Sequence, residues 1–148
     1  MIKLPALVAV AVLFLPGTAL AQTPPADTTP PDAVLQINTT LNSIDSMIGN
    51  GLTFSADPSE DLTYTAKATI KVKGKTITVA KSIREGQIYN QSDGFVEQSI
   101  PHGSDSAVKA LIKVKKGSKV AVTLTLVLKD TAGNTKTVKK TVKLKKRY

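Results

Sequence analysis

The feature that most constrains the fold is a strict alternation of apolar and polar residues between positions 62 and 73. Successive side chains of a β-strand point to opposite sides of the sheet, whereas a helix repeats about every 3.6 residues. Even positions are apolar and odd positions are threonine or lysine: Leu62, Tyr64, Ala66, Ala68, Ile70 and Val72 against Thr63, Thr65, Lys67, Thr69, Lys71 and Lys73. The pattern predicts a long strand with one face buried and the other in water.

Shorter alternations predict the remaining strands. They lie within residues 34–38, 52–56, 77–79, 95–100, 120–128 and 138–144. Two short helices are expected between them, one over 43–49 that is capped by Ser43 and closed by Gly49, and one from Ser104 towards Gly117. About seven short strands without a long helix predict an all-β chain folded as an antiparallel sandwich.

One residue does not fit this pattern. Lys140 shares its parity with Val138 and Val142, so a regular strand would direct it towards the core. A β-bulge would resolve the conflict, and so would a position at the rim of the sandwich, where the lysine stem can lie along apolar surface. We favour the rim.

Residues 1–21 have the three parts of a secretory signal peptide. Lys3 precedes an apolar run over 4–15, and Ala19 and Ala21 form an A-x-A cleavage site. Because a spanning helix needs about 20 apolar residues, we expect cleavage after Ala21 rather than an uncleaved anchor. The expected product is a bacterial protein that is secreted or associated with the cell envelope, without an integral membrane span.

The expected mature chain has two parts. Residues 22–32 hold four prolines and no large apolar side chain, which predicts a disordered, extended leader. Residues 33–148 form one domain. The chain contains no cysteine, so the domain is expected to be stable through core packing alone, and disulfides and zinc-thiolate sites are excluded.

The last hairpin carries a recognisable turn. Asp130, Ala132, Gly133 and Asn134 form a D-x-A-G-N sequence between two alternating runs. This ending resembles the terminal hairpin of bacterial immunoglobulin-like and fibronectin-like domains, and the stretches 43–56 and 104–117 are similar to immunoglobulin-like repeats of exported actinobacterial proteins. The resemblance covers about residues 31–148 and implies an immunoglobulin-like sandwich. It implies no particular function, because such domains serve as spacers, adhesins and enzyme appendages.

Charge is unevenly distributed along the chain. Residues 22–66 carry six carboxylates and no basic side chain, whereas residues 67–148 carry 19 basic and 5 acidic side chains, a net charge of +14. If the basic strands share a sheet, they form a face that attracts polyanions by counterion release. The candidate polyanion-binding residues are Lys67, Lys71, Lys73, Lys129, Lys136, Lys139, Lys143, Lys145, Lys146 and Arg147. Alternatively, the lysines only solvate the face and keep strand edges from pairing.

The amino-acid composition limits the kinds of molecule that such a face could bind. Nearly all the basic residues are lysines, which act as point charges, and the chain has only three Tyr, three Phe and no Trp for stacking on bases or sugars. We therefore expect no sequence-specific nucleic-acid recognition. Anionic envelope glycopolymers are the expected partners, and another envelope protein, with lysines serving only solubility, is the alternative.

Catalytic residues are poorly represented. His102 is the only histidine, and its neighbours Ser104 and Asp105 are adjacent in sequence, whereas a catalytic triad needs a spatial arrangement. Ser104 is better explained as a helix cap. We expect no enzymatic activity; a small exported enzyme or inhibitor is the least favoured alternative.

Metal binding has one weak candidate. Asp57, Glu60 and Asp61 lie in one turn, and Asp130 could join them as calcium ligands if its turn lies at the same end of the domain. Three carboxylates in a turn are more often simply hydrated, so the expectation is that the protein uses no metal or other cofactor.

Overall fold

The computed structural model describes residues 26–92 and 94–148. The predicted signal peptide, with its cleavage residues Ala19 and Ala21, lies outside the described residues. None of the described helices is long and apolar enough to cross a membrane.

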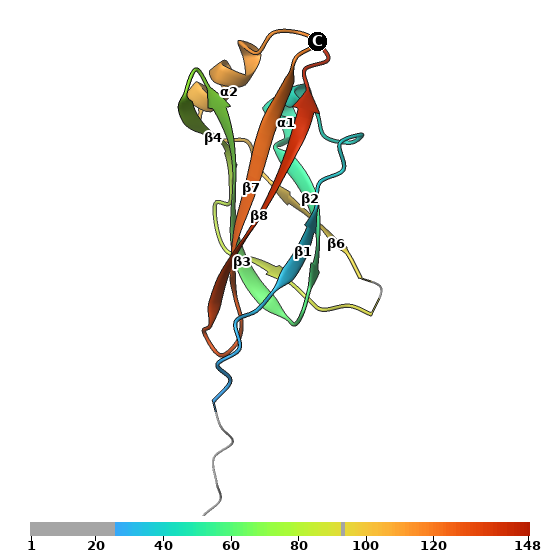
Figure 1. Cartoon of the computed structure of the whole chain (residues 1–148), viewed down its shortest axis with the longest axis vertical. Helices are drawn as coiled ribbons and strands as arrows, with labels where there is room; N and C mark the ends of the chain where they lie inside the picture. Colours follow the sequence, from blue (N-terminus) through green and yellow to red (C-terminus); the bar gives the residue numbers. More distant parts are fainter. Residues whose placement is uncertain (1–25, 93) are drawn as a thin grey trace, which may run out of the picture.

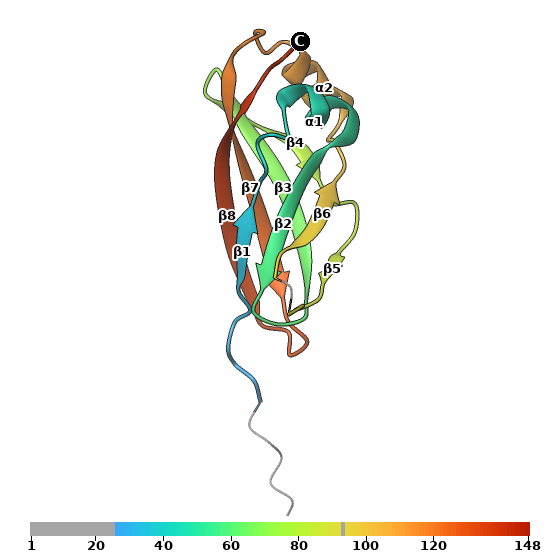
Figure 2. The same ribbon diagram turned by 90° about the vertical axis from the view of Figure 1, so that its right-hand side faces the viewer.

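Within the described residues, eight antiparallel strands form two sheets, with two short helices at one end (Figure 1, Figure 2). Sheet A has the order β1-β2-β6, and sheet B has the order β4-β3-β7-β8. The short strand β5 also pairs with β3, at the opposite end of β3 from β4. The elements are β1 Ala33–Gln36, α1 Ile44–Asn50, β2 Leu52–Pro58, β3 Leu62–Val72, β4 Lys75–Lys81, β5 Gly86–Ile88, β6 Val96–Ile100, α2 Asp105–Ile112, β7 Lys119–Lys129 and β8 Thr135–Lys145. The predicted antiparallel sandwich is confirmed.

The core lies between the two sheets and follows the alternation of the sequence. Leu62, Tyr64, Ala66, Ala68 and Ile70 of β3 are all buried. They lie beside the buried residues Leu124, Leu126 and Leu128 of β7 in the same sheet. Across the core they face sheet A, whose fully buried residues are Leu52, Phe54 and Ile100. The residues between these apolar positions point away from the core and form the outer faces of the two sheets.

An aromatic contact joins the two sheets. The ring of Phe54 in β2 meets the ring of Tyr64 in β3 edge to face, with centroids 5.9 Å apart. The Tyr64 hydroxyl donates a hydrogen bond to Oε1 of Gln98 in β6 over 2.9 Å. Burial raises the pKa of Tyr64, so this hydroxyl keeps its proton.

Both predicted helices are present, with local differences. Ser43 caps α1 as predicted, and the Ser43 and Ser46 side chains each accept a hydrogen bond from the other residue's backbone amide. The helix closes at Gly51 rather than Gly49: the φ of Gly51 is 79°, and a Cβ there would overlap the carbonyl oxygen of Ile100. Ser104 occupies the cap position of α2, but its hydroxyl lies 2.8 Å from that of Ser106 and does not cap the backbone.

Lys140 lies at the rim of the sandwich. The register of β7 and β8 is continuous and sets Leu124 opposite Lys140, so β8 has no bulge there. Lys140 is exposed although Leu124 is completely buried. The reason is that β8 is the edge strand of sheet B, and its inner side is only partly covered there.

Residues 26–32 run along the lower end of the sandwich in Figure 1, beside the β2–β3 and β7–β8 turns. The backbone amide of Asp32 donates to Oγ of Ser59, and the Asn134 side-chain amide donates to the carbonyl oxygen of Asp27 over 3.0 Å. The D-x-A-G-N turn therefore holds this segment as well as closing the last hairpin.

Candidate polyanion-binding face

The outer face of sheet B gathers lysines from four strands. The register places Lys67 of β3 between Lys81 of β4 and Thr125 of β7, and Thr125 is in turn opposite Lys139 of β8. Neighbouring strands are about 4.8 Å apart, so this row spans about 14 Å. The two lysine-rich stretches share one sheet, which is the condition on which a basic face depends.

Further lysines extend the face along the strands. Lys71 is opposite Thr76, Lys143 is opposite Ala121, and Lys119 is opposite Lys145. We call the following residues the lysine face: Lys67, Lys71, Lys81, Lys119, Lys129, Lys139, Lys143 and Lys145. All eight are exposed, and no outward-facing residue of β3, β4, β7 or β8 carries a carboxylate.

Threonines form the floor between these lysines. One complete row crosses the sheet through Thr78, Thr69, Thr123 and Thr141. The hydroxyl oxygens of Thr123 and Thr141 lie 2.9 Å apart, and one donates to the other. Two shallow hollows, of about 470 and 450 Å³, lie over this floor, and lysines line both. Arg84 and Glu85, from the loop between β4 and β5, also line the second hollow. The floor therefore offers hydroxyl groups between positive charges.

Three of the ten predicted residues lie elsewhere and already have partners. The Lys136 ammonium is 2.6 Å from the Asp32 carboxylate, and the buried Lys146 ammonium is 2.7 Å from that of Asp45. The Arg147 guanidinium donates to the carbonyl oxygen of Thr40. Lys136 and Lys146 have the inward parity of β8, which separates them from the face.

Lys73 was also predicted to join the face, but it lies in the tip of the β3–β4 hairpin. Lys81 and Lys119 belong to the face and were missed. Lys119 has the outward parity of β7, so its position could have been predicted from the alternation. Lys81 could not, because a register shift in β4 buries Val79 and Ala80 in succession and reverses the parity.

The buried pair of Asp45 and Lys146 ties sheet B to α1. Burial alone would raise the pKa of Asp45, but hydrogen bonds from Lys146 and from the backbone amides of Arg147 and Tyr148 outweigh it and lower the pKa. The carboxylate is thus ionised at neutral pH, and it fixes the C-terminal end of β8 against the helix.

The carboxylates at the lower end gather differently from the prediction. Carboxylate oxygens of Asp27, Glu60 and Asp130 lie within 4.8 Å of one another, whereas Asp57 and Asp61 are not part of this group. Asp61 instead accepts a hydrogen bond from the Asn90 backbone amide. Burial would raise the pKa of Asp130, but hydrogen bonds from the Asn134 side chain and the turn amides lower it. These hydrogen bonds make Asp130 a residue of the turn.

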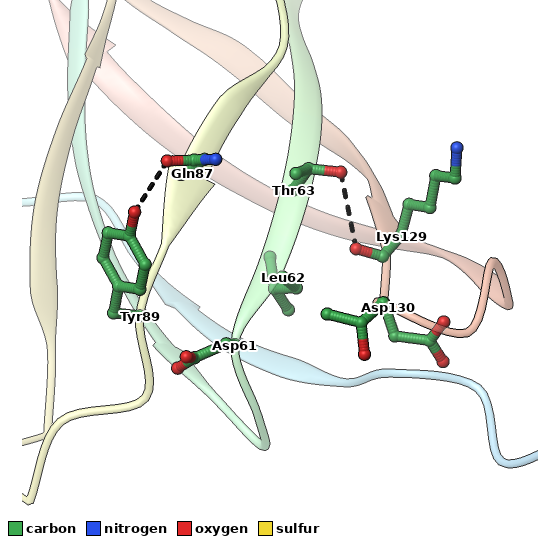
Figure 3. A pocket seen from close by; sticks show the side chains of 8 residues that line it. Asp61, Leu62, Thr63, Gln87, Tyr89, Lys129 and Asp130 are labelled. Atoms are coloured by element: carbon green, nitrogen blue, oxygen red, sulfur yellow. Dashed lines mark hydrogen bonds between the residues drawn. The ribbon is translucent and has the colours of Figure 1, made fainter. Parts of the chain in front are cut away.

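A small pocket of about 220 Å³ lies at the lower end of β3 (Figure 3). Tyr89 forms one wall, where its hydroxyl donates to Oε1 of Gln87 over 2.7 Å. Lys129 lies on the opposite side, and its backbone carbonyl accepts a hydrogen bond of 3.5 Å from Thr63. The Lys129 ammonium points away from Tyr89 in Figure 3.

His102 stands apart from these sites. Its exposed ring has Nδ1 2.9 Å from the carbonyl oxygen of Gly103, and its backbone bridges to Ala80. Within the described residues, no hydrogen bond joins the ring to Ser104 or Asp105. The arrangement provides a turn between β6 and α2.

No protein-family description, curated protein or solved structure matches this chain.

Proposed function

We propose that the protein is a secreted, non-enzymatic module of the bacterial cell envelope that binds anionic polymers through the lysine face. The observation that carries this proposal is the collection of eight exposed lysines from four strands on one side of sheet B, without an outward carboxylate among them. Such a surface releases counterions from a polyanion on binding, so its affinity depends steeply on salt.

The composition of the face favours a flexible, uniformly charged chain. Lysine ammonium groups act as point charges without fixed direction, and the threonine floor adds hydroxyl donors and acceptors. The outward residues of β3, β4, β7 and β8 include no aromatic side chain on which a base or sugar could stack. A glycopolymer with phosphate or carboxylate groups along its length suits this chemistry. Export rests on the N-terminal pattern of residues 1–21.

The test is binding of the purified protein to soluble poly(glycerol phosphate) over a series of salt concentrations. We expect binding at low salt to weaken at least tenfold as the ionic strength rises to about 0.15 M. The variant Lys67→Glu/Lys139→Glu/Lys143→Glu is expected to lose at least 100-fold in affinity. Circular dichroism and thermal unfolding establish that each variant is folded.

A matched variant separates the face from net charge. Lys75→Glu/Lys115→Glu/Lys116→Glu changes the net charge equally but alters exposed lysines outside the lysine face. It is expected to bind within about fivefold of the wild type. Equal losses in both variants, or binding insensitive to salt, would contradict the proposal. Capture of an envelope protein that survives the face variant would favour the protein–protein alternative.

A further inference from the structure

A second basic site lies outside the lysine face, in a cleft between α2 and the β3–β4 hairpin. The cleft has a volume of about 430 Å³, within the range of small-molecule sites. Its rim carries the ammonium-bearing residues Lys73, Lys109 and Lys113, and no carboxylate residue lines it. Both elements lie at the upper end of the molecule in Figure 1, far along β3 from the carboxylate turns.

The floor of the cleft is apolar. Val72 and Val114 are half-buried and pack against the core, and Ala110 lies between the lysines of the helix. The floor therefore differs from that of the lysine face, where threonine hydroxyls lie between the lysines. A hydrophilic polymer gains nothing from apolar floor residues, whereas an alkyl group does.

The helix α2 is divided into two faces. Ala107 and Leu111 are buried in the core. Ser106, Lys109 and Lys113 lie at intervals of three and four residues, so they share another side of the helix, which lines the cleft. The cleft is thus built from a regular helix face opposite a tight hairpin, and its shape does not depend on a long loop.

Lys73 has an unusual backbone. Its φ of 48° lies in the left-handed region, and among the described residues it is the only one other than glycine with a positive φ. It forms a two-residue hairpin loop with Gly74, since Val72 is opposite Lys75. Asparagine or glycine would fit this position with less strain. A lysine here places a third positive charge on the cleft opposite Lys109 and Lys113.

We propose that this cleft binds an anionic amphiphile, a phosphate group attached to an alkyl chain. The phosphate lies among the three ammonium groups, and the first part of the chain covers Val72, Ala110 and Val114. This inference is independent of the polymer-binding function, because the two sites share no residue of the lysine face.

The test uses monomeric dodecyl phosphate below its micelle concentration, followed by amide chemical shifts of the purified protein. We expect saturable binding with shift changes at Val72, Ser106, Ala110 and Val114, and no change at Thr123 or Thr141. Inorganic phosphate and uncharged dodecyl maltoside are expected to bind at least tenfold more weakly. Equal binding by either one would overturn the proposal, because either the alkyl chain or the charge would then be dispensable.

Variants test the lysines themselves. Lys109→Gln/Lys113→Gln is expected to weaken dodecyl phosphate binding at least tenfold, while Lys115→Gln/Lys116→Gln stays within threefold of the wild type. Should both pairs behave alike, the cleft is not the site. Vesicles of phosphatidylglycerol, with phosphatidylcholine as the neutral control, distinguish the source of the headgroup. Binding to anionic vesicles with none to monomeric dodecyl phosphate would overturn the proposal in favour of a membrane-surface contact.

Discussion

The two sheets have the same kind of interior but opposite outer faces. Both bury alternate apolar residues, as Phe54 in sheet A and Leu124 in sheet B illustrate. On the outside, sheet A presents Gln36, Asp57 and Glu97 and no basic residue. The outward residues of β3, β4, β7 and β8 in sheet B are mostly lysine and threonine and include no carboxylate. The alternation that builds the sandwich leaves outward positions free, so the two faces can differ without a cost to the fold.

The contrast between the two outer faces follows from the uneven distribution of charge along the sequence. The acidic half of the chain supplies β1, β2 and the β2–β3 turn, and the basic half supplies most of sheet B. Because the two sheets pack through their inner faces, the core holds the polar outer residues of the two sheets apart. Interior and exterior positions of one strand should therefore respond differently to substitution.

The largest expected effect comes from the interior of sheet B. Leu124→Ala removes a completely buried side chain of β7 and is expected to cost about 3 kcal/mol of unfolding free energy. Val127→Ala truncates an exposed residue on the opposite face of the same strand and is expected to change stability by less than about 0.5 kcal/mol. Urea unfolding measures both. A similar cost for the two variants would contradict the inside–outside assignment of β7.

Much of this inside–outside assignment could be predicted from the sequence, because strand alternation is local. The buried side of β3 agrees with the apolar positions from Leu62 to Ile70. The positions that the sequence did not predict are those set by contacts between segments distant in sequence. Val79 and Ala80 are buried in succession at a register shift. Lys146 ends a run of lysines, but its buried ammonium contacts the carboxylate of Asp45, 101 residues earlier in the sequence. The short strand β5 was missed because its three residues form too short a pattern to detect.

The lysine face was predicted in outline, and its floor was not. The odd-numbered lysines of β3 and β8 share a sheet, but Lys136 has the inward parity of β8 and contacts the Asp32 carboxylate. The threonine row appears only when four strands are placed in register, because its members are distant in sequence. The cleft at α2 likewise needs the helix and the hairpin to be placed together.

The next effect concerns the ion pair between Asp45 and the buried Lys146, which joins the two charge halves. Asp45→Asn leaves the Lys146 ammonium, whose side chain is only 9% exposed, without a counter-charge. We expect a loss of about 2 kcal/mol at neutral pH, below the value for completely buried pairs because Asp45 retains some contact with water. Thermal and urea unfolding of the two proteins at equal ionic strength measure the difference.

The control is the pH dependence of the stability difference between the wild type and Asp45→Asn. The folded-state pKa of Asp45 is lowered, so its contribution is complete above the ordinary carboxyl pKa of about 3.9 and is lost as the pH falls through the folded value. The wild type should therefore approach Asp45→Asn in stability on acidification. A difference that stays constant down to acidic pH would show that Asp45 stabilises the protein by packing rather than by charge.

A smaller effect tests which lysines count as part of the face. Lys139→Gln removes one charge of the lysine face from the middle of β8, so the slope of log affinity against log salt for poly(glycerol phosphate) should fall by about 0.7–0.9. Lys136→Gln lies on the same strand with opposite parity and should leave the slope unchanged. If both substitutions reduce the slope equally, the polymer responds to the charge of β8 as a whole and not to one side of the sheet.

The smallest effect is expected at the exposed ion pair of the lower end. Lys136 and Asp32 approach within 2.6 Å, but their side chains remain 43% and 56% exposed, so water and salt screen their attraction. The hydrogen bond from Lys136, helped by the backbone amide of Ala33, lowers the pKa of Asp32. Asp32→Asn is nevertheless expected to cost no more than about 0.5 kcal/mol, because holding two long side chains together opposes the gain. Urea unfolding at low and high salt measures this cost, and a loss as large as that of Asp45→Asn would mean that burial does not decide the strength of these two pairs.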